Sequence, residues 1–173
     1  MSARKTRSEP VSTSPGPLPC AAPRADKERL RIDLQVATRA RGVPPEADFR
    51  RWARAVPARR ADVTLRLVGM PEGRRLNRLF RGKDYATNVL SFRYERSPGV
   101  AVGDLLLCVP VIAREAREQG KHCAAHYAHL TVHGMLHLLG YGHERAPQAG
   151  KMERLEKCIL HSLGFADPYG KRP

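Results

Sequence analysis

The spacing of histidines between residues 122 and 139 constrains the fold of this chain more than any other feature. The periodicity of this run predicts one long helix, which turns by about 100° per residue, so that four of its histidines lie within an arc of roughly 80°. They are His126, His129, His133 and His137. Gly140 gives the helix a place to end, and Gly142 lets the chain turn sharply. That turn can bring His143 back to the same face.

The trio of His133, His137 and His143 predicts a metal site. Imidazoles at i and i+4 can point at one ion, and His143 adds a third ligand after the bend. Three neutral imidazoles with one open position describe a catalytic zinc site better than a closed structural site, which favours thiolates. We therefore predict one bound Zn²⁺, and the same ligand types also suit Ni²⁺. We interpret His126 and His129 as structural or supporting neighbours.

The net charge indicates a polyanionic partner. Lysine and arginine number 31 against 17 aspartate and glutamate residues, which gives a net charge of +14. A domain this basic is expected to bind nucleic acid above all. The alternative is a well-solvated, arginine-rich surface, but solubility alone needs much less net charge.

The rest of the sequence predicts a single compact α+β domain. Patterns typical of strands cover residues 31–37, 62–68, 88–94 and 104–109. Helical patterns cover residues 45–56, 70–80, 110–120, 122–139 and 151–164. We expect a four-stranded mixed sheet packed by helices, with a zincin-like helix that carries the metal site. The domain is expected to span residues 29–165, between a disordered leader (1–28) and a tail (166–173).

Membrane association is not expected. No apolar run approaches the ~20 residues that are needed to span a bilayer, and the N-terminal segment has no apolar stretch long enough for a signal peptide. We therefore expect a cytoplasmic protein.

Three segments together resemble one known family. HGMLHLLGYGH (133–143) looks like the H-G-x-L-H-L-x-G-Y-D-H signature of the YbeY family of bacterial zinc-dependent endoribonucleases. LNRLFRGKDYATNVLSF (76–92) is similar to the family's L-N-x-x-x-R-x-K-D-x-x-T-N-V-L-S-F segment, and GDLLLCVPVIAREAREQGK (103–121) resembles its G-D-I-x-I-C strand with the helix that follows. The three matches occur in the family's order and cover residues from about 31 to 164.

The resemblance implies a function and a second site residue. It implies a single-strand-specific endoribonuclease that matures the 3′ end of 16S ribosomal RNA and supports ribosome biogenesis and quality control. The implied partners are ribosomal RNA, the small ribosomal subunit, ribosomal proteins and other ribonucleases. Arg81 matches the arginine that the family holds near its zinc, and a planar guanidinium suits phosphate. The turn after it is expected to be shaped by Asp84, Thr87 and Asn88.

Two differences from known sequence motifs bear on the mechanism. Gly142 replaces the aspartate that the family places before its third histidine, which we expect to weaken function without abolishing it. Gly134 stands where zinc peptidases carry a glutamate base, and it can instead allow a strand or the substrate to approach the helix. Zinc alone lowers the pKa of its water to about 7, so the nucleophile is either this water or the 2′-hydroxyl of RNA.

Two other classes of function stay open. A zinc peptidase is disfavoured by the missing glutamate and by the basic surface. A non-catalytic, ribosome-associated RNA-binding factor would keep the metal only for folding, and Gly142 gives this alternative some support.

Overall fold

The computed structural model describes residues 30–142 and 146–170. The predicted leader, residues 1–28, and His143 lie outside these ranges. Nine elements follow one another along the described chain: β1 (Leu30–Ala37), α1 (Glu46–Ala55), β2 (Arg60–Val68), α2 (Met70–Arg81), β3 (Val89–Arg93), β4 (Val100–Cys108), α3 (Val109–Glu118), α4 (Cys123–Leu138) and α5 (Ala146–Ser162).

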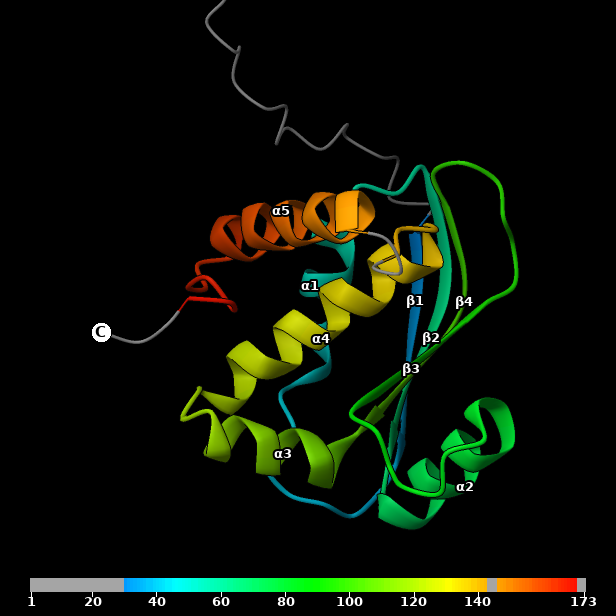
Figure 1. Ribbon diagram of the computed structural model, residues 1–173, viewed down its shortest axis with the longest axis vertical. Coiled ribbons are helices and arrows are strands. Elements are labelled where there is room, and N and C mark those ends of the chain that lie inside the picture. Colours follow the sequence, from blue (N-terminus) through cyan, green and yellow to red (C-terminus); the bar gives the residue numbers. More distant parts are fainter. Residues whose placement is uncertain (1–29, 143–145, 171–173) are drawn as a thin grey trace, which may run out of the picture.

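The four strands form one mixed sheet in the order β1-β2-β4-β3. β1 and β4 both run parallel to β2, whereas β3 runs antiparallel to β4 and forms an edge of the sheet. On one face of this sheet lie α1 and α4, with α5 packed against α4 on the side away from the sheet, and α2 lies on the other face (Figure 1). The predicted fold class, an α+β domain with a four-stranded mixed sheet, is therefore confirmed.

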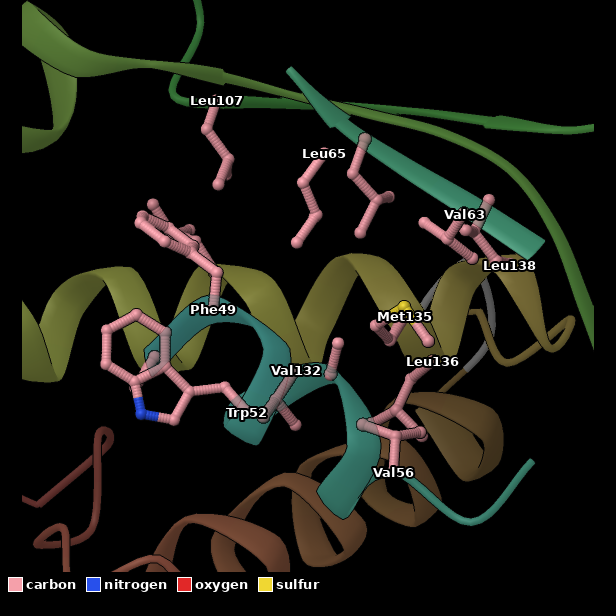
Figure 2. Close-up of a cluster of buried hydrophobic side chains, with 14 of the residues drawn as sticks. Phe49, Trp52, Val56, Val63, Leu65, Leu107, Val132, Met135, Leu136 and Leu138 are labelled. Atoms are coloured by element: carbon pink, nitrogen blue, oxygen red, sulfur yellow. The ribbon is translucent and has the colours of Figure 1, made fainter. Parts of the chain in front are cut away.

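The main hydrophobic core lies between the sheet and α4. Leu65 of β2 and Leu107 of β4 point down at α4, and Phe49 and Trp52 of α1 fill the space beneath (Figure 2). Phe49 and Trp52 meet edge to face, with their ring centroids 5.2 Å apart. Because α4 is packed from three sides, its histidine-bearing face is held in a fixed orientation relative to β3 and β4.

Gly134 permits the close approach of α4 to the sheet. A Cβ atom at this position would lie only 2.8 Å from Cδ2 of Leu105 in β4, which is closer than packed atoms tolerate. Of the two roles expected for this glycine, the structure supports the approach of a strand. The residue that replaces a peptidase's catalytic glutamate therefore serves packing in this chain.

Strand β4 and helix α5 begin four and five residues before their predicted starts, whereas every other boundary lies within two residues of the prediction. Helix α3 begins at Val109, one residue before the predicted start at Pro110, which occupies the first turn, where its missing N–H would have no helical partner. Helix α5 begins at Ala146, five residues before the predicted start, since Gly150 interrupts the apolar pattern without ending the helix. Strand β4 begins at Val100, ahead of the glycine that interrupts its pattern.

The described end of the chain, residues 166–170, packs against the domain. The Lys121 ammonium donates to the Pro168 carbonyl at 2.7 Å, and Lys157 pairs with Asp167 at 3.0 Å. Part of the segment expected to be a tail therefore lies on the surface formed by the start of α4 and the end of α5. No described helix is both long enough and apolar enough to cross a bilayer.

Candidate metal centre

His133 and His137 direct their imidazoles at each other from successive turns of α4. Their Nε2 atoms are 3.0 Å apart, and their ring centroids are 4.6 Å apart. Two nitrogens that bind one tetrahedral zinc at 2.0–2.1 Å are themselves roughly 3.3 Å apart. The two rings are therefore nearly in position to share an ion.

The Nδ1 partners of these rings decide which nitrogens carry protons. His137 Nδ1 lies 3.0 Å from the carbonyl oxygen of Tyr141, which only accepts, so this nitrogen must donate. His133 Nδ1 lies 2.7 Å from a carboxylate oxygen of Glu156 and must donate for the same reason. In the neutral imidazoles both Nε2 atoms then present lone pairs across 3.0 Å. A cation between them removes this repulsion, and such outer hydrogen bonds are typical of metal-binding histidines.

The turn after α4 supplies the carbonyl that orients His137. The helix ends with bonds from the Gly140 N–H to the His137 carbonyl and from the Tyr141 N–H to the Leu136 carbonyl. Gly140 has φ +92°, a conformation that favours glycine, as expected for the helix end. The chain thereby folds back over the last turn, and the Tyr141 carbonyl faces the His137 ring.

Glu156 is a fully buried carboxylate that links α5 to α4. Besides the His133 bond, it accepts a hydrogen bond from the Tyr169 hydroxyl, and His129 Nε2 lies 3.7 Å from its second oxygen. Burial raises the pKa of Glu156, but the contacts from His129, His133 and Tyr169 outweigh burial and lower it to about 2. Glu156 is therefore ionised at neutral pH and holds the Nδ1 proton of His133.

A second grouping of possible ligands shares His133. One ligand atom each from His129, His133 and Glu156 lie within 4.8 Å of one another, so this group can also hold a metal ion. It would, however, compete with the hydrogen bond that His133 Nδ1 donates to Glu156. The pair formed by His133 and His137 needs no such rearrangement, and we favour it.

His126 has a structural partner. Its Nε2 lies 2.8 Å from Glu115 of α3, and the same carboxylate oxygen accepts from the Asn88 side chain at 2.9 Å. Burial lowers the pKa of His126, and the bond to Glu115 opposes this effect. The structural role expected for His126 agrees with these contacts, which join α4 to the loop before β3.

Arg81 lines the same cavity as the two histidines. This cavity, of about 440 Å³, is bounded by the end of α2, the following loop, β3 and α4, and both His133 and His137 face it. Arg81 is exposed, and among the described residues no carboxylate forms an ion pair with it. Its charge is therefore available to an anion in the cavity.

The loop that follows Arg81 is held by side chains. Helix α2 ends at Gly82, with φ +67°, whose N–H donates to the Arg78 carbonyl. The Asn77 amide donates to the Tyr85 carbonyl at 2.7 Å, and Asn88 accepts from the Val89 N–H through its side-chain oxygen. The turn-forming role expected for Asn88 is confirmed, and Asp84 is held by Arg74 through two hydrogen bonds.

Of the predicted site residues, the structure brings His133, His137 and Arg81 to one cavity. His143 lies outside the described residues, so its place in the ligand set stays a prediction. Sequence reasoning missed Glu156, although a signal existed. Met152, Glu156 and Ile159 share the buried face of α5, and a carboxylate among apolar residues on such a face indicates a buried partner.

Comparisons with known proteins point to one family. Residues 45–164 match the family described as Endoribonuclease YbeY. The chain is 55% identical over 150 residues to the Endoribonuclease YbeY of Alkalilimnicola ehrlichii, which covers 81% of this chain and 90% of the relative. It is 57% identical over 145 residues to that of Aromatoleum aromaticum, covering 82% and 93%. A solution structure of a Thermotoga maritima protein matches 80% of this chain and 99% of its own with 22% identity and a TM-score of 0.44.

Proposed function

The chain belongs to the Endoribonuclease YbeY family, and from this premise we propose that it cleaves phosphodiester bonds within RNA, using a divalent metal ion held by His133, His137 and His143. The observation that carries the proposal is the cavity in which the facing Nε2 atoms of the two described histidines and the exposed guanidinium of Arg81 come together.

The charge in this cavity suits a phosphodiester. A phosphate bound between Arg81 and the metal ion that His133 and His137 would hold would meet positive charge from two sides, and the planar guanidinium can donate two parallel hydrogen bonds to its oxygens. Lys83 lines the same cavity and adds a second cation. These fixed donors can stabilise the additional negative charge of the transition state without reorganising.

The side chains have distinct roles in the proposed reaction. The metal ion, when bound, supplies Lewis-acid catalysis and makes water more acidic at neutral pH. His133 and His137 hold it through Nε2, while Glu156 and the Tyr141 carbonyl keep the two Nδ1 atoms protonated. Arg81 binds the non-bridging oxygens of the phosphate. No glutamate is needed at position 134, where Gly134 contacts β4 instead.

We further propose that the substrate is precursor ribosomal RNA, cleaved late in the maturation of the 16S 3′ end. Family membership and the net charge of +14 support this substrate. Under this proposal the protein acts in the cytoplasm, and its partners are the small ribosomal subunit, ribosomal proteins and other ribonucleases. The metal is Zn²⁺ or a related ion such as Ni²⁺.

A cleavage assay on precursor 16S RNA tests the proposal. The wild type should shorten the RNA, and chelation should stop the reaction. Arg81→Gln should lower the rate at least tenfold with metal content unchanged, because charge-assisted hydrogen bonds to the phosphate are lost. Arg75→Gln, also on α2 and exposed, removes the same charge and is the matched control. Cleavage by Arg81→Gln at the wild-type rate would remove the role assigned to Arg81.

The same assay separates the other two classes of function. Binding of RNA without cleavage by the metal-loaded wild type would indicate a non-catalytic factor. Cleavage of casein with intact RNA would indicate a peptidase. Either result would overturn the proposed endonuclease activity.

A further inference from the structure

The cleft continues beyond the histidines along β3. A second cavity, of about 410 Å³, adjoins the first, and the two share Arg81, Ser91 and His137 in their walls. Lys83 lines only the first cavity, and Arg93 lines only the second. Together the cavities form one trench that passes the metal centre and has a cation toward each end.

The free edge of β3 forms the floor of this trench. The Cys108 N–H of β4 donates to the Asn88 carbonyl, and the Tyr94 N–H donates to the Val102 carbonyl, so in this antiparallel ladder every second residue from 88 to 94 faces β4. Ser91 belongs to the other, alternating set of residues, so its backbone N–H and carbonyl point away from β4. Because the described sheet ends at β3, these groups face the trench.

Arg93 is fixed in place but keeps its charge available. Its Nε donates to the Glu95 backbone carbonyl at 2.7 Å. Because this carbonyl has no net charge, the positive charge of Arg93 is not neutralised. Its guanidinium lies against Gly140, where any Cβ would collide with Nη1. In the described part of the chain no carboxylate pairs with Arg93, whereas Arg60 and Arg74 each form an ion pair. Arg93 is thus a preorganised cation beside the turn that follows His137.

We propose that Arg93 binds a second backbone phosphate of the RNA, next to the phosphate that is cleaved, so that the strand runs along the edge of β3. The Ser91 N–H would donate to the sugar–phosphate backbone between the two phosphates. This inference rests on the proposed endonuclease function and adds the path of the substrate through the site.

The geometry favours a phosphate over a base as the ligand of Arg93. The second cavity has a largely polar lining, and its aromatic residue, Tyr141, is half-buried and lies under Lys151, whose Nζ is 5.6 Å from the ring centroid. A polar trench with a fixed guanidinium and an outward backbone N–H offers donors rather than a stacking surface. Contacts of this type position a strand without reading its sequence.

The test compares Arg93→Gln with Arg54→Gln. Arg54 is exposed on α1, whose helix packs against α4 away from the trench, so both variants lose one charge and only one changes the trench. Affinity for a ten-nucleotide single-stranded 2′-O-methyl RNA, which has no free 2′-hydroxyl to attack the phosphate, is measured on the metal-loaded chain over a range of salt concentrations. Melting temperature and metal content are recorded for every variant.

Arg93→Gln should weaken binding about tenfold at low salt and reduce the slope of log affinity against log salt by about 0.7, the value for one lost phosphate contact. Arg54→Gln should leave the slope unchanged. Ser91→Pro removes an N–H that the ladder does not use and should also weaken binding, whereas Ser91→Ala should not.

If Arg93 only braces the Gly140 turn, Arg93→Gln will have a lower melting temperature than the wild type and an unchanged salt slope. That result would overturn the inference. Equal slopes for Arg93→Gln and Arg54→Gln would do so as well. If the wild type binds and cleaves RNA while these slopes are equal, only the path along β3 is wrong. If the wild type cleaves no RNA, the proposed function itself fails.

Discussion

Replacing Glu156 with glutamine tests how the protein orients its metal ligands. Glu156 accepts a hydrogen bond from Nδ1 of His133 at 2.7 Å and another from the Tyr169 hydroxyl, and its side chain is almost completely shielded from water. Glutamine has nearly the same shape. Its carbonyl can still accept from His133, and its NH₂ can donate to the Tyr169 oxygen, because a phenol both donates and accepts. The fold should therefore persist while the charge is lost.

The expected magnitude follows from the bond that changes. A charge-assisted bond becomes a neutral one, and the His133 ring becomes less basic at Nε2. Loss of such an outer partner typically lowers metal affinity by about 10- to 100-fold, or about 1.4–2.7 kcal/mol. Since the glutamine preserves an acceptor, we expect the lower end of this range.

The assay is a zinc titration in competition with a chelator of known affinity. Glu153→Gln, an exposed site on the same helix, removes the same charge and should leave zinc affinity unchanged. Tyr169→Phe removes one partner of the second Glu156 oxygen and should cause a smaller loss than Glu156→Gln. Equal zinc affinity in Glu156→Gln and the wild type would refute this account of His133.

Three further predictions concern single positions. Gly142→Asp should raise zinc affinity up to about tenfold in the same titration, because no heavy atom lies within 4 Å of its Cβ position and a carboxylate there can orient His143. A lower zinc affinity would contradict the expectation that the glycine weakens function. Gly134→Ala should destabilise the fold by about 1–3 kcal/mol in urea unfolding despite the better helix propensity of alanine, and it should cost less in a chain that already carries Leu105→Ala, which makes room for the added methyl group. An unaffected stability would refute the tight approach to β4. The pKa of Glu156 falls from 4.5 to about 2 on folding, so ionised Glu156 stabilises the fold above pH 4.5, and this stabilisation is lost as the pH falls toward 2. The free energy of unfolding of the metal-free protein should fall over this pH range, and it should fall less steeply in Glu156→Gln.

Local patterns predicted the elements but not their arrangement. The alternation in β1 and β2 placed both strands to within two residues, because alternate residues face the core: Ile32 in the edge strand β1, and Ala61, Val63 and Leu65 in β2, are buried. The position of β4 between β2 and β3 carries no local signal, since strand order is set by packing between distant segments. The start of α3 was placed to within one residue because proline favours the first turn of a helix, whereas the early start of α5 was hidden by Gly150, which a helix interior tolerates.

The residues of the candidate site also divide into those that local sequence patterns predict and those that only the tertiary fold brings together. His133 and His137 were predictable because a helical repeat alone places them on one face. Glu156 lies 23 residues beyond His133 on another helix, and Arg93 meets the Gly140 turn only because β3 passes α4. Neither contact follows from spacing along the chain. The sequence therefore predicts the pair of rings, and the tertiary fold supplies the groups that orient them.

The central claim is that His133 and His137 share one metal ion. Its most direct test is the number of metal ions per chain, measured by mass spectrometry on purified His137→Ala and His129→Ala beside the wild type. We predict one ion per chain in the wild type and in His129→Ala and a loss of the ion in His137→Ala. Retention of the ion by His137→Ala together with its loss from His129→Ala would contradict the claim and place the metal at His129, His133 and Glu156 instead.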